Sequence, residues 1–73
     1  MKKVMELKPG DVIRFNLCGE LTIARVYNTE VYSTWTRLDL QPQNDRAVNG
    51  WGFRFKTWLN TDAFVEVLGN DKG

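Results

Sequence analysis

Aromatic and charged side chains alternate in residues 50–58, GWGFRFKTW, and this pattern constrains the fold more than any other feature of the sequence. Neighbouring side chains on a β-strand point to opposite faces of the sheet, so an extended segment here separates two kinds of residue. One face receives three rings, those of Trp51, Phe53 and Phe55. The other receives two cations and a fourth ring, those of Arg54, Lys56 and Trp58. The pattern predicts a strand with an apolar inner face and a basic, aromatic outer face.

Other segments rich in β-branched and aromatic residues also lie between turn signals. They predict four more strands, at residues 11–16, 20–27, 31–40 and 63–68. No segment keeps an apolar period of 3.6 residues, so we expect almost no helix.

Turn signals separate these strands. The stretch LKPGD opens with Pro and Gly in the order of a β-turn, and Gly19 is free to take a positive φ. Residues 28–30 are short enough for a hairpin turn, and residues 41–50 have the composition of an exposed loop. The stretch LNTDAF predicts a single helical or 3₁₀ turn capped by Asn60 or Thr61.

Five short strands favour a small closed barrel over a flat sheet, because closure hides the edges that a short sheet exposes. The strand order and the LKPGD opening resemble the SH3-like barrel over residues 7–68. The resemblance implies an all-β, five-stranded barrel with a short 3₁₀ turn before the last strand. The acidic loop and paired tyrosines of peptide-binding SH3 domains are absent, so the resemblance does not imply recognition of proline-rich peptides.

A chain of 73 residues has room for one domain, which we expect at residues 1–68, followed by a frayed tail at 69–73. Its 42% hydrophobic and 26% charged residues are typical of a globular domain. No apolar run approaches the roughly 20 residues of a membrane helix. The single Cys18 cannot form an internal disulfide, and the first residues lack the apolar core of a signal peptide, so we expect a partly buried thiol and a cytoplasmic protein.

Pairing of the third and fourth predicted strands defines the expected faces. We expect Leu40 to lie opposite Trp51 and Leu38 opposite Phe53, with Arg37 opposite Arg54 on the outer face. The predicted core comprises Val12 or Ile13, Phe15, Ile23, Val26, Tyr32, Leu38, Leu40, Phe53, Phe55, Val65 and Val67. Residues 20–27 are apolar on both faces, which predicts either a β-bulge or burial through homo-oligomer contacts.

Catalysis has little support in the sequence. Without histidine, neither a Ser-His-Asp nor a Cys-His arrangement can form, and one cysteine cannot build a nitrogen and sulfur metal site. The GWG stretch lacks the length and the lysine of a phosphate-binding loop. We therefore expect no enzyme activity, no metal and no cofactor.

Binding of a macromolecule is the remaining possibility. Cations and aromatic rings on one sheet face are the means by which proteins hold single-stranded nucleic acid. The candidate residues are Trp35, Arg37, Arg54, Lys56 and Trp58, with Arg46 as a secondary loop contact. Trp and Arg are also enriched at protein interfaces, so the alternative is a small regulatory protein that docks on a larger one, as accessory and phage-encoded proteins do. A third reading is that the tryptophans only cover the ends of the barrel.

Overall fold

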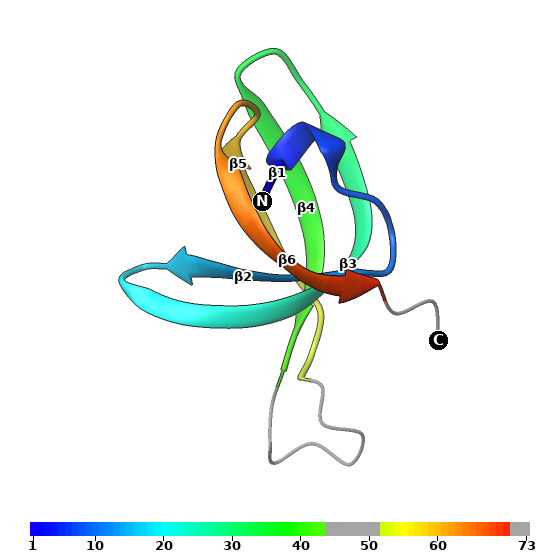
Figure 1. Cartoon of the computed structure of the whole chain (residues 1–73), viewed down its shortest axis with the longest axis vertical. Helices are drawn as coiled ribbons and strands as arrows, with labels where there is room; N and C mark the ends of the chain where they lie inside the picture. Colours follow the sequence, from blue (N-terminus) through cyan, green and yellow to red (C-terminus); the bar gives the residue numbers. More distant parts are fainter. Residues whose placement is uncertain (44–51, 71–73) are drawn as a thin grey trace.

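Antiparallel strands form one curled sheet in the computed structural model, which describes residues 1–43 and 52–70 (Figure 1). The described residues make six strands and one 3₁₀ helix: β1 (Lys2–Lys3), η1 (Val4–Glu6), β2 (Asp11–Leu17), β3 (Glu20–Val31), β4 (Trp35–Pro42), β5 (Phe55–Asn60) and β6 (Phe64–Asn70). Their order in the sheet is β1-β6-β2-β3-β4-β5. The predicted all-β class is confirmed, with six strands instead of five because the two-residue β1 pairs with β6.

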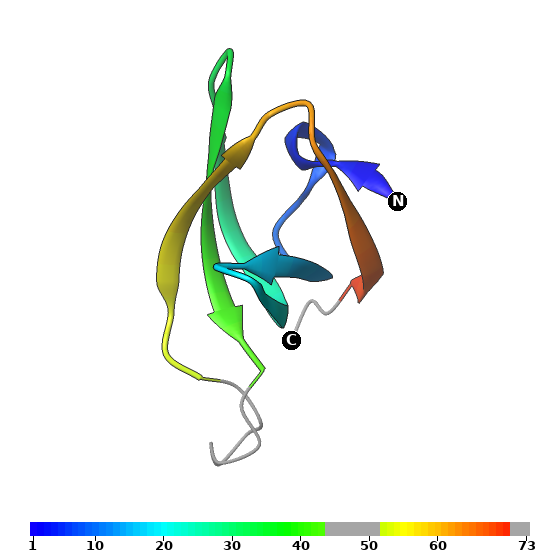
Figure 2. The same cartoon turned by 90° about the vertical axis from the view of Figure 1, so that its left-hand side faces the viewer.

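The sheet curls into a half-barrel (Figure 2). β1 and β5 are its two edges, and within the described residues they are not hydrogen-bonded to each other. No helix in this described part is long and apolar enough to cross a membrane.

Two early turns follow the local sequence chemistry. The Asp11 N–H donates to the Lys8 carbonyl at 3.1 Å, and Gly10 takes a φ of 95°, as the third position of a type II turn requires. Cys18 and Gly19 both have positive φ and join β2 to β3 in a two-residue hairpin. The expectation of a partly buried thiol is wrong, because Cys18 is exposed at this turn.

A β-bulge divides β3. Val26 pairs with Leu40 and Asn28 pairs with Asp39, which leaves Tyr27 without a partner in the ladder. The predicted β-bulge is thus present, at the end of the segment that is apolar on both faces, while Leu21 on the outward face stays 65% exposed. The predicted turn at 28–30 is wrong, since β3 continues to Val31.

The pairing of β4 with β5 differs from the predicted register by four residues. Leu40 lies opposite Phe55, and Arg37 lies opposite Trp58 instead of Arg54. β5 begins only at Phe55, so the strand predicted at 51–58 starts too early. Because the shift is an even number, each side chain that stays within β5 keeps its predicted face.

The turn between β5 and β6 is not the predicted 3₁₀ turn. It is a β-turn in which the Ala63 N–H donates to the Asn60 carbonyl at 3.0 Å, and the Asn60 side chain accepts from the Asp62 N–H at 2.9 Å. The 3₁₀ helix of this structure is η1, which carries Val4 into the core. β6 extends to Asn70, two residues into the predicted tail.

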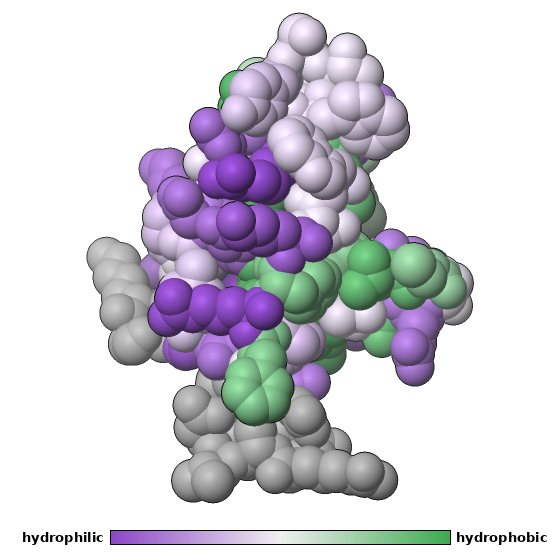
Figure 3. Space-filling model, turned by 180° about the vertical axis from the view of Figure 1, so that it is seen from behind, coloured by the Kyte–Doolittle hydropathy of each residue, from purple (hydrophilic) through white to green (hydrophobic). Residues whose placement is uncertain are grey.

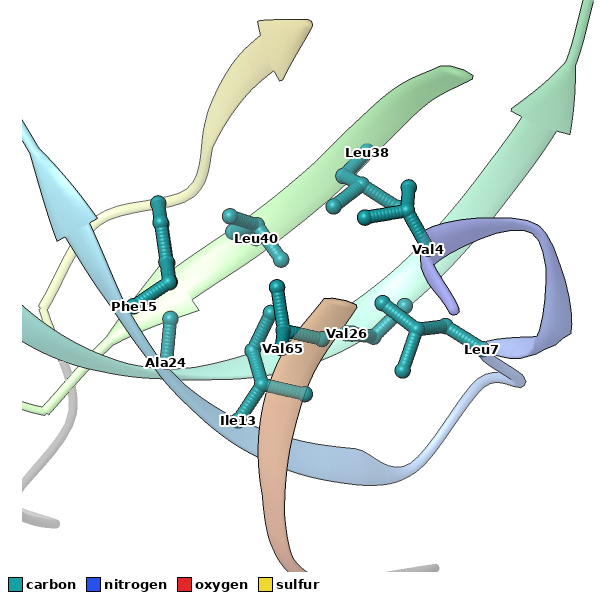
Figure 4. Close-up of a cluster of buried hydrophobic side chains, with 9 residues drawn as sticks. All are labelled: Val4, Leu7, Ile13, Phe15, Ala24, Val26, Leu38, Leu40 and Val65. Atoms are coloured by element: carbon teal, nitrogen blue, oxygen red, sulfur yellow. The ribbon is translucent and has the colours of Figure 1, made fainter. Parts of the chain in front are cut away.

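Nine buried side chains fill the curl of the sheet (Figure 4): Val4, Leu7, Ile13, Phe15, Ala24, Val26, Leu38, Leu40 and Val65. Phe55 and Val67 pack against this core as predicted, although both are partly exposed. Two predicted core residues lie elsewhere, because Phe53 precedes β5 with 96% of its surface exposed and Tyr32 lies in the turn after β3. Ile23 is half-buried and outside the core cluster.

Candidate binding face

The outward side of β3, β4 and β5 carries the predicted site, and we call it the outer face. Cross-strand pairing sets Arg37 between Glu30 and Trp58, and Asp39 between Asn28 and Lys56. Seen from behind, pale aromatic and small polar residues gather at one end of the molecule and strongly hydrophilic residues lie below them (Figure 3). The outer face therefore has ends of different chemistry.

Three half-exposed rings form its aromatic end: Tyr32, Trp35 and Trp58. The ring centroids of Tyr32 and Trp58 are 5.7 Å apart, with planes tilted by 42°. Trp35 begins β4, two residues before the residue paired with Trp58. Each of the three exposes 49–52% of its surface, so these side chains are open to a ligand.

Two buried threonines hold this aromatic end in place. The hydroxyls of Thr36 and Thr61 are hydrogen-bonded at 2.9 Å, and the Thr61 hydroxyl donates to the Tyr32 carbonyl at 2.8 Å. The Thr61 N–H donates to the Thr34 carbonyl, also at 2.8 Å. These bonds tie the β3–β4 turn to the β5–β6 turn, so the loop that carries Tyr32 is fixed relative to Trp58.

The centre of the outer face is a row of ion pairs. Arg37 lies 2.9 Å from the Glu30 carboxylate and 3.8 Å from Asp39. The predicted pairing of Arg37 with Arg54 is wrong, because Arg37 lies opposite Trp58 on β5 and opposite Glu30 on β3. This arginine is thus largely neutralised before any ligand arrives.

The cationic end lies around the bulge. The guanidinium carbon of Arg54 lies 3.7 Å from the centroid of the Tyr27 ring, a stacked cation–π contact. Arg25 donates to the Tyr27 hydroxyl and to Gln41, each at 2.8 Å, and the Tyr27 hydroxyl donates to Gln41 at 2.6 Å. Lys56, two residues after Arg54, is exposed on β5 opposite Asp39.

Tyr27 and Tyr32 lie in opposite electrostatic environments, which shift their pKa values in opposite directions. Desolvation acts to raise the pKa of Tyr27, but hydrogen bonds and charge from Arg25 and Arg54 outweigh it and hold the pKa below the ordinary 10.0. At the other end, a hydrogen bond with Glu30, with desolvation and the Glu30 charge, raises the pKa of Tyr32. The outer face is thus more positive at the Tyr27 end.

Four of the predicted site residues lie on the outer face: Trp35, Arg37, Lys56 and Trp58. The fifth, Arg54, precedes β5 and contacts the outer face by stacking on the Tyr27 ring. Arg46 and Trp51 lie outside the described residues. Tyr27 was not among the predicted site residues, and its unpaired bulge position brings it outward; Tyr32 was predicted to lie in the core. Period-2 alternation alone could not identify either, because both stand where regular pairing stops.

Comparisons of the sequence and structure with known proteins found no relatives. The chain matches no protein family model, and no curated protein or solved structure is significantly similar to it. Within residues 1–43 and 52–70, no group of three or more His, Cys, Asp or Glu side chains could hold a metal ion.

Proposed function

We propose that this protein is a non-enzymatic module that binds nucleic acid on its outer face. The main observation behind this proposal is that exposed cations and exposed aromatic rings lie on the same surface. Arg54 and Lys56 are exposed and form no salt bridge with any described residue, while Trp35 and Trp58 are half-exposed nearby. Cations contact phosphates and rings stack on bases, so the face offers both kinds of contact that nucleic acid needs.

The proposed fold type is an SH3-like small barrel extended by β1 and η1. Consecutive strands β2 to β5 are neighbours in the sheet, and β6 returns to pair with β2. A long, bulged β3 that belongs to both halves of the curl supports this assignment. The free, exposed thiol of Cys18 supports a reducing compartment, and we propose the cytoplasm.

Titration of the tryptophan fluorescence with oligonucleotides at several salt concentrations tests the proposed function. With about two phosphates neutralised, by Arg54 and Lys56, log K for a single strand should fall with log salt at a slope of about −1.4. A complete lack of binding at low salt would overturn the proposal.

Charge variants separate this face from the rest of the surface. Arg54→Gln and Lys56→Gln should each weaken binding and reduce the slope by about 0.7. Lys3→Gln is the matched control, because Lys3 also sits near a ring, 6.0 Å from Phe64, but on the opposite edge of the sheet. An equal loss with Lys3→Gln would show that binding is not confined to the outer face.

A second candidate function is docking on a larger protein, and the ion-pair row favours it. Trp35, Trp58 and Arg37 are of the residue types enriched at protein interfaces, and the ion pairs of Arg37 suit the polar rim of such an interface. Such binding would change little with salt. Recovery of a partner that is unaffected by Trp35→Ala and Trp58→Ala would remove the aromatic end as its anchor.

A further inference from the structure

We infer that the ligand of the outer face is a single strand, whose unpaired bases stack on the aromatic end while its phosphates lie at the cationic end. This inference rests on the proposed nucleic-acid function. It assigns different tasks to the two ends, and it excludes the duplex as the preferred ligand.

Ring exposure is the first reason. Tyr32, Trp35 and Trp58 present about half of their surfaces to solvent on a convex sheet face. The faces of paired bases are covered by their neighbours in a duplex, so only unpaired bases can stack on such rings. A duplex would reach this protein only through its phosphates.

Charge distribution is the second reason. The acids on the outer face, Glu30 and Asp39, flank Arg37 at its centre. Lys56 lies directly opposite Asp39, and Arg54 lies two residues before Lys56, farther from Tyr32. Phosphates are therefore repelled from the centre and attracted to the cationic end. This distribution assigns phosphate contacts to the cationic end and base contacts to the aromatic end.

The separation of Arg54 from Trp58 sets the size of the ligand. Arg54 directly precedes β5 and Trp58 follows Arg54 by four residues, which corresponds to about 13 Å in an extended chain. A mononucleotide can occupy one end only, whereas an oligonucleotide can bridge both. Affinity should therefore rise with strand length until both ends are engaged.

The aromatic end is also held ready for stacking. The Thr36–Thr61 hydrogen bond and the bond from Thr61 to the Tyr32 carbonyl join the two turns behind the rings. A fixed platform loses little conformational freedom when a ligand binds. Thr61 is thus a positioning residue for stacking, without contact to the ligand.

The test compares three probes by fluorescence anisotropy under identical salt. These are an unstructured DNA strand of about 12 nucleotides, within the site size of small single-strand-binding folds, a duplex of the same length, and a mononucleotide. The single strand should bind at least about tenfold tighter than the duplex. Trp58→Ala should weaken single-strand binding by about tenfold, the loss expected for one base stack, and leave duplex binding unchanged.

Controls keep the two proposals distinguishable. Phe64→Ala removes a ring that is 58% exposed on β6, away from the outer face, and should change nothing. Trp58→Phe keeps a stacking ring and should retain most of the affinity, which separates stacking from a fold defect. Equal binding of strand and duplex, with no effect of Trp58→Ala, would overturn the single-strand inference and leave the proposed function intact. Failure of all three probes to bind would overturn the proposed function itself.

Discussion

Tyr27 and Tyr32 occupy opposite ends of the outer face and differ in the charge beside them. Two guanidinium groups surround Tyr27, whereas a carboxylate accompanies Tyr32. Arg25 and Glu30 each precede their tyrosine by two residues, so these two neighbours are local in sequence, whereas Arg54 is not. Arg54 is 27 positions from Tyr27, and the two meet because β3 and β5 both pair with β4.

These environments predict two separate tyrosine titrations. Tyr27 should ionise first, below pH 10.0, and Tyr32 above it. A lowered folded pKa contributes stability above the unfolded pKa, so the ionisation of Tyr27 adds stability to the fold only at alkaline pH. The raised pKa of Tyr32 contributes stability below the unfolded pKa that is lost as pH rises through the folded value. Ultraviolet absorbance of tyrosinate measures both steps, with Tyr27→Phe and Tyr32→Phe assigning them.

Arg54→Gln provides the matched test of this electrostatic assignment. Loss of the stacked guanidinium should raise the pKa of Tyr27 toward its ordinary value and leave Tyr32 unchanged. A Tyr27 titration that does not move would contradict the stacked contact.

Cys18 carries backbone strain at the β2–β3 hairpin. Its φ of 52° lies in the left-handed region, which costs most residues about 1 kcal/mol and which Asn adopts more readily. Cys18→Asn should therefore raise the free energy of unfolding by roughly 0.5 kcal/mol. Urea denaturation measures the change, and Cys18→Ser, which removes the thiol without the conformational preference, should show no gain.

Gly19 gives the complementary change at the same turn. A Cβ there would meet no atom within 4 Å, so the cost of Gly19→Ala comes from its φ of 83° alone. We expect a loss of about 1 kcal/mol. A neutral result would show that the turn relaxes to another type.

Strands and turns were predictable from the sequence where their own residues determine them, and were not where contacts with distant residues decide. The LKPGD turn and the two-residue hairpin were predictable because their own residues impose them. The start of β5 was not, since Phe53 is as apolar as Phe55 and no local signal shows where pairing with β4 begins. The side chains within β5 lie on their predicted faces despite the wrong register, because the register differs by an even number of residues.

Short elements escaped prediction for another reason. β1 and η1 together span five residues, too few to show any period, yet they place Val4 in the core. The ion pairs of Arg37 were equally hidden, because Glu30 reaches it only with the bulge in β3. The sequence thus predicted which candidate residues lie on the outer face, but not which residues on neighbouring strands they contact.

Asp11 links the first turn to the last strand. Its buried carboxylate accepts the Lys8 N–H and the Asn70 side-chain amide, each at 2.9 Å. Asp11→Ala leaves a backbone donor without its acceptor, so the free energy of unfolding should fall by about 1–3 kcal/mol. Asn70→Ala should cost less, because only the bond to β6 is lost, and an equal loss would contradict the role of the turn. Thermal and urea denaturation measure both variants.

For the complete sheet, stability depends on how the N-terminal segment seals an open curl. Val4 and Leu7 enter the core from η1 and the residue after it (Figure 4). The Val4 N–H also donates to the Ala63 carbonyl at 2.8 Å and the Met5 N–H to the Thr61 carbonyl at 3.3 Å. The same segment that covers the core therefore braces the turn behind the aromatic end.

Leu7→Ala tests this sealing role. Removing a buried leucine side chain should lower the free energy of unfolding by about 2–4 kcal/mol, a large share of the roughly 4–11 kcal/mol expected for a domain of this size. Met5→Ala is the matched control in η1, since Met5 is 46% exposed, and its cost should stay below about 0.5 kcal/mol. Urea denaturation followed by tryptophan fluorescence measures both. Equal, small losses would show that the sheet holds its core without the N-terminal segment, and the brace behind the aromatic end would then have to come from Thr36 and Thr61 alone.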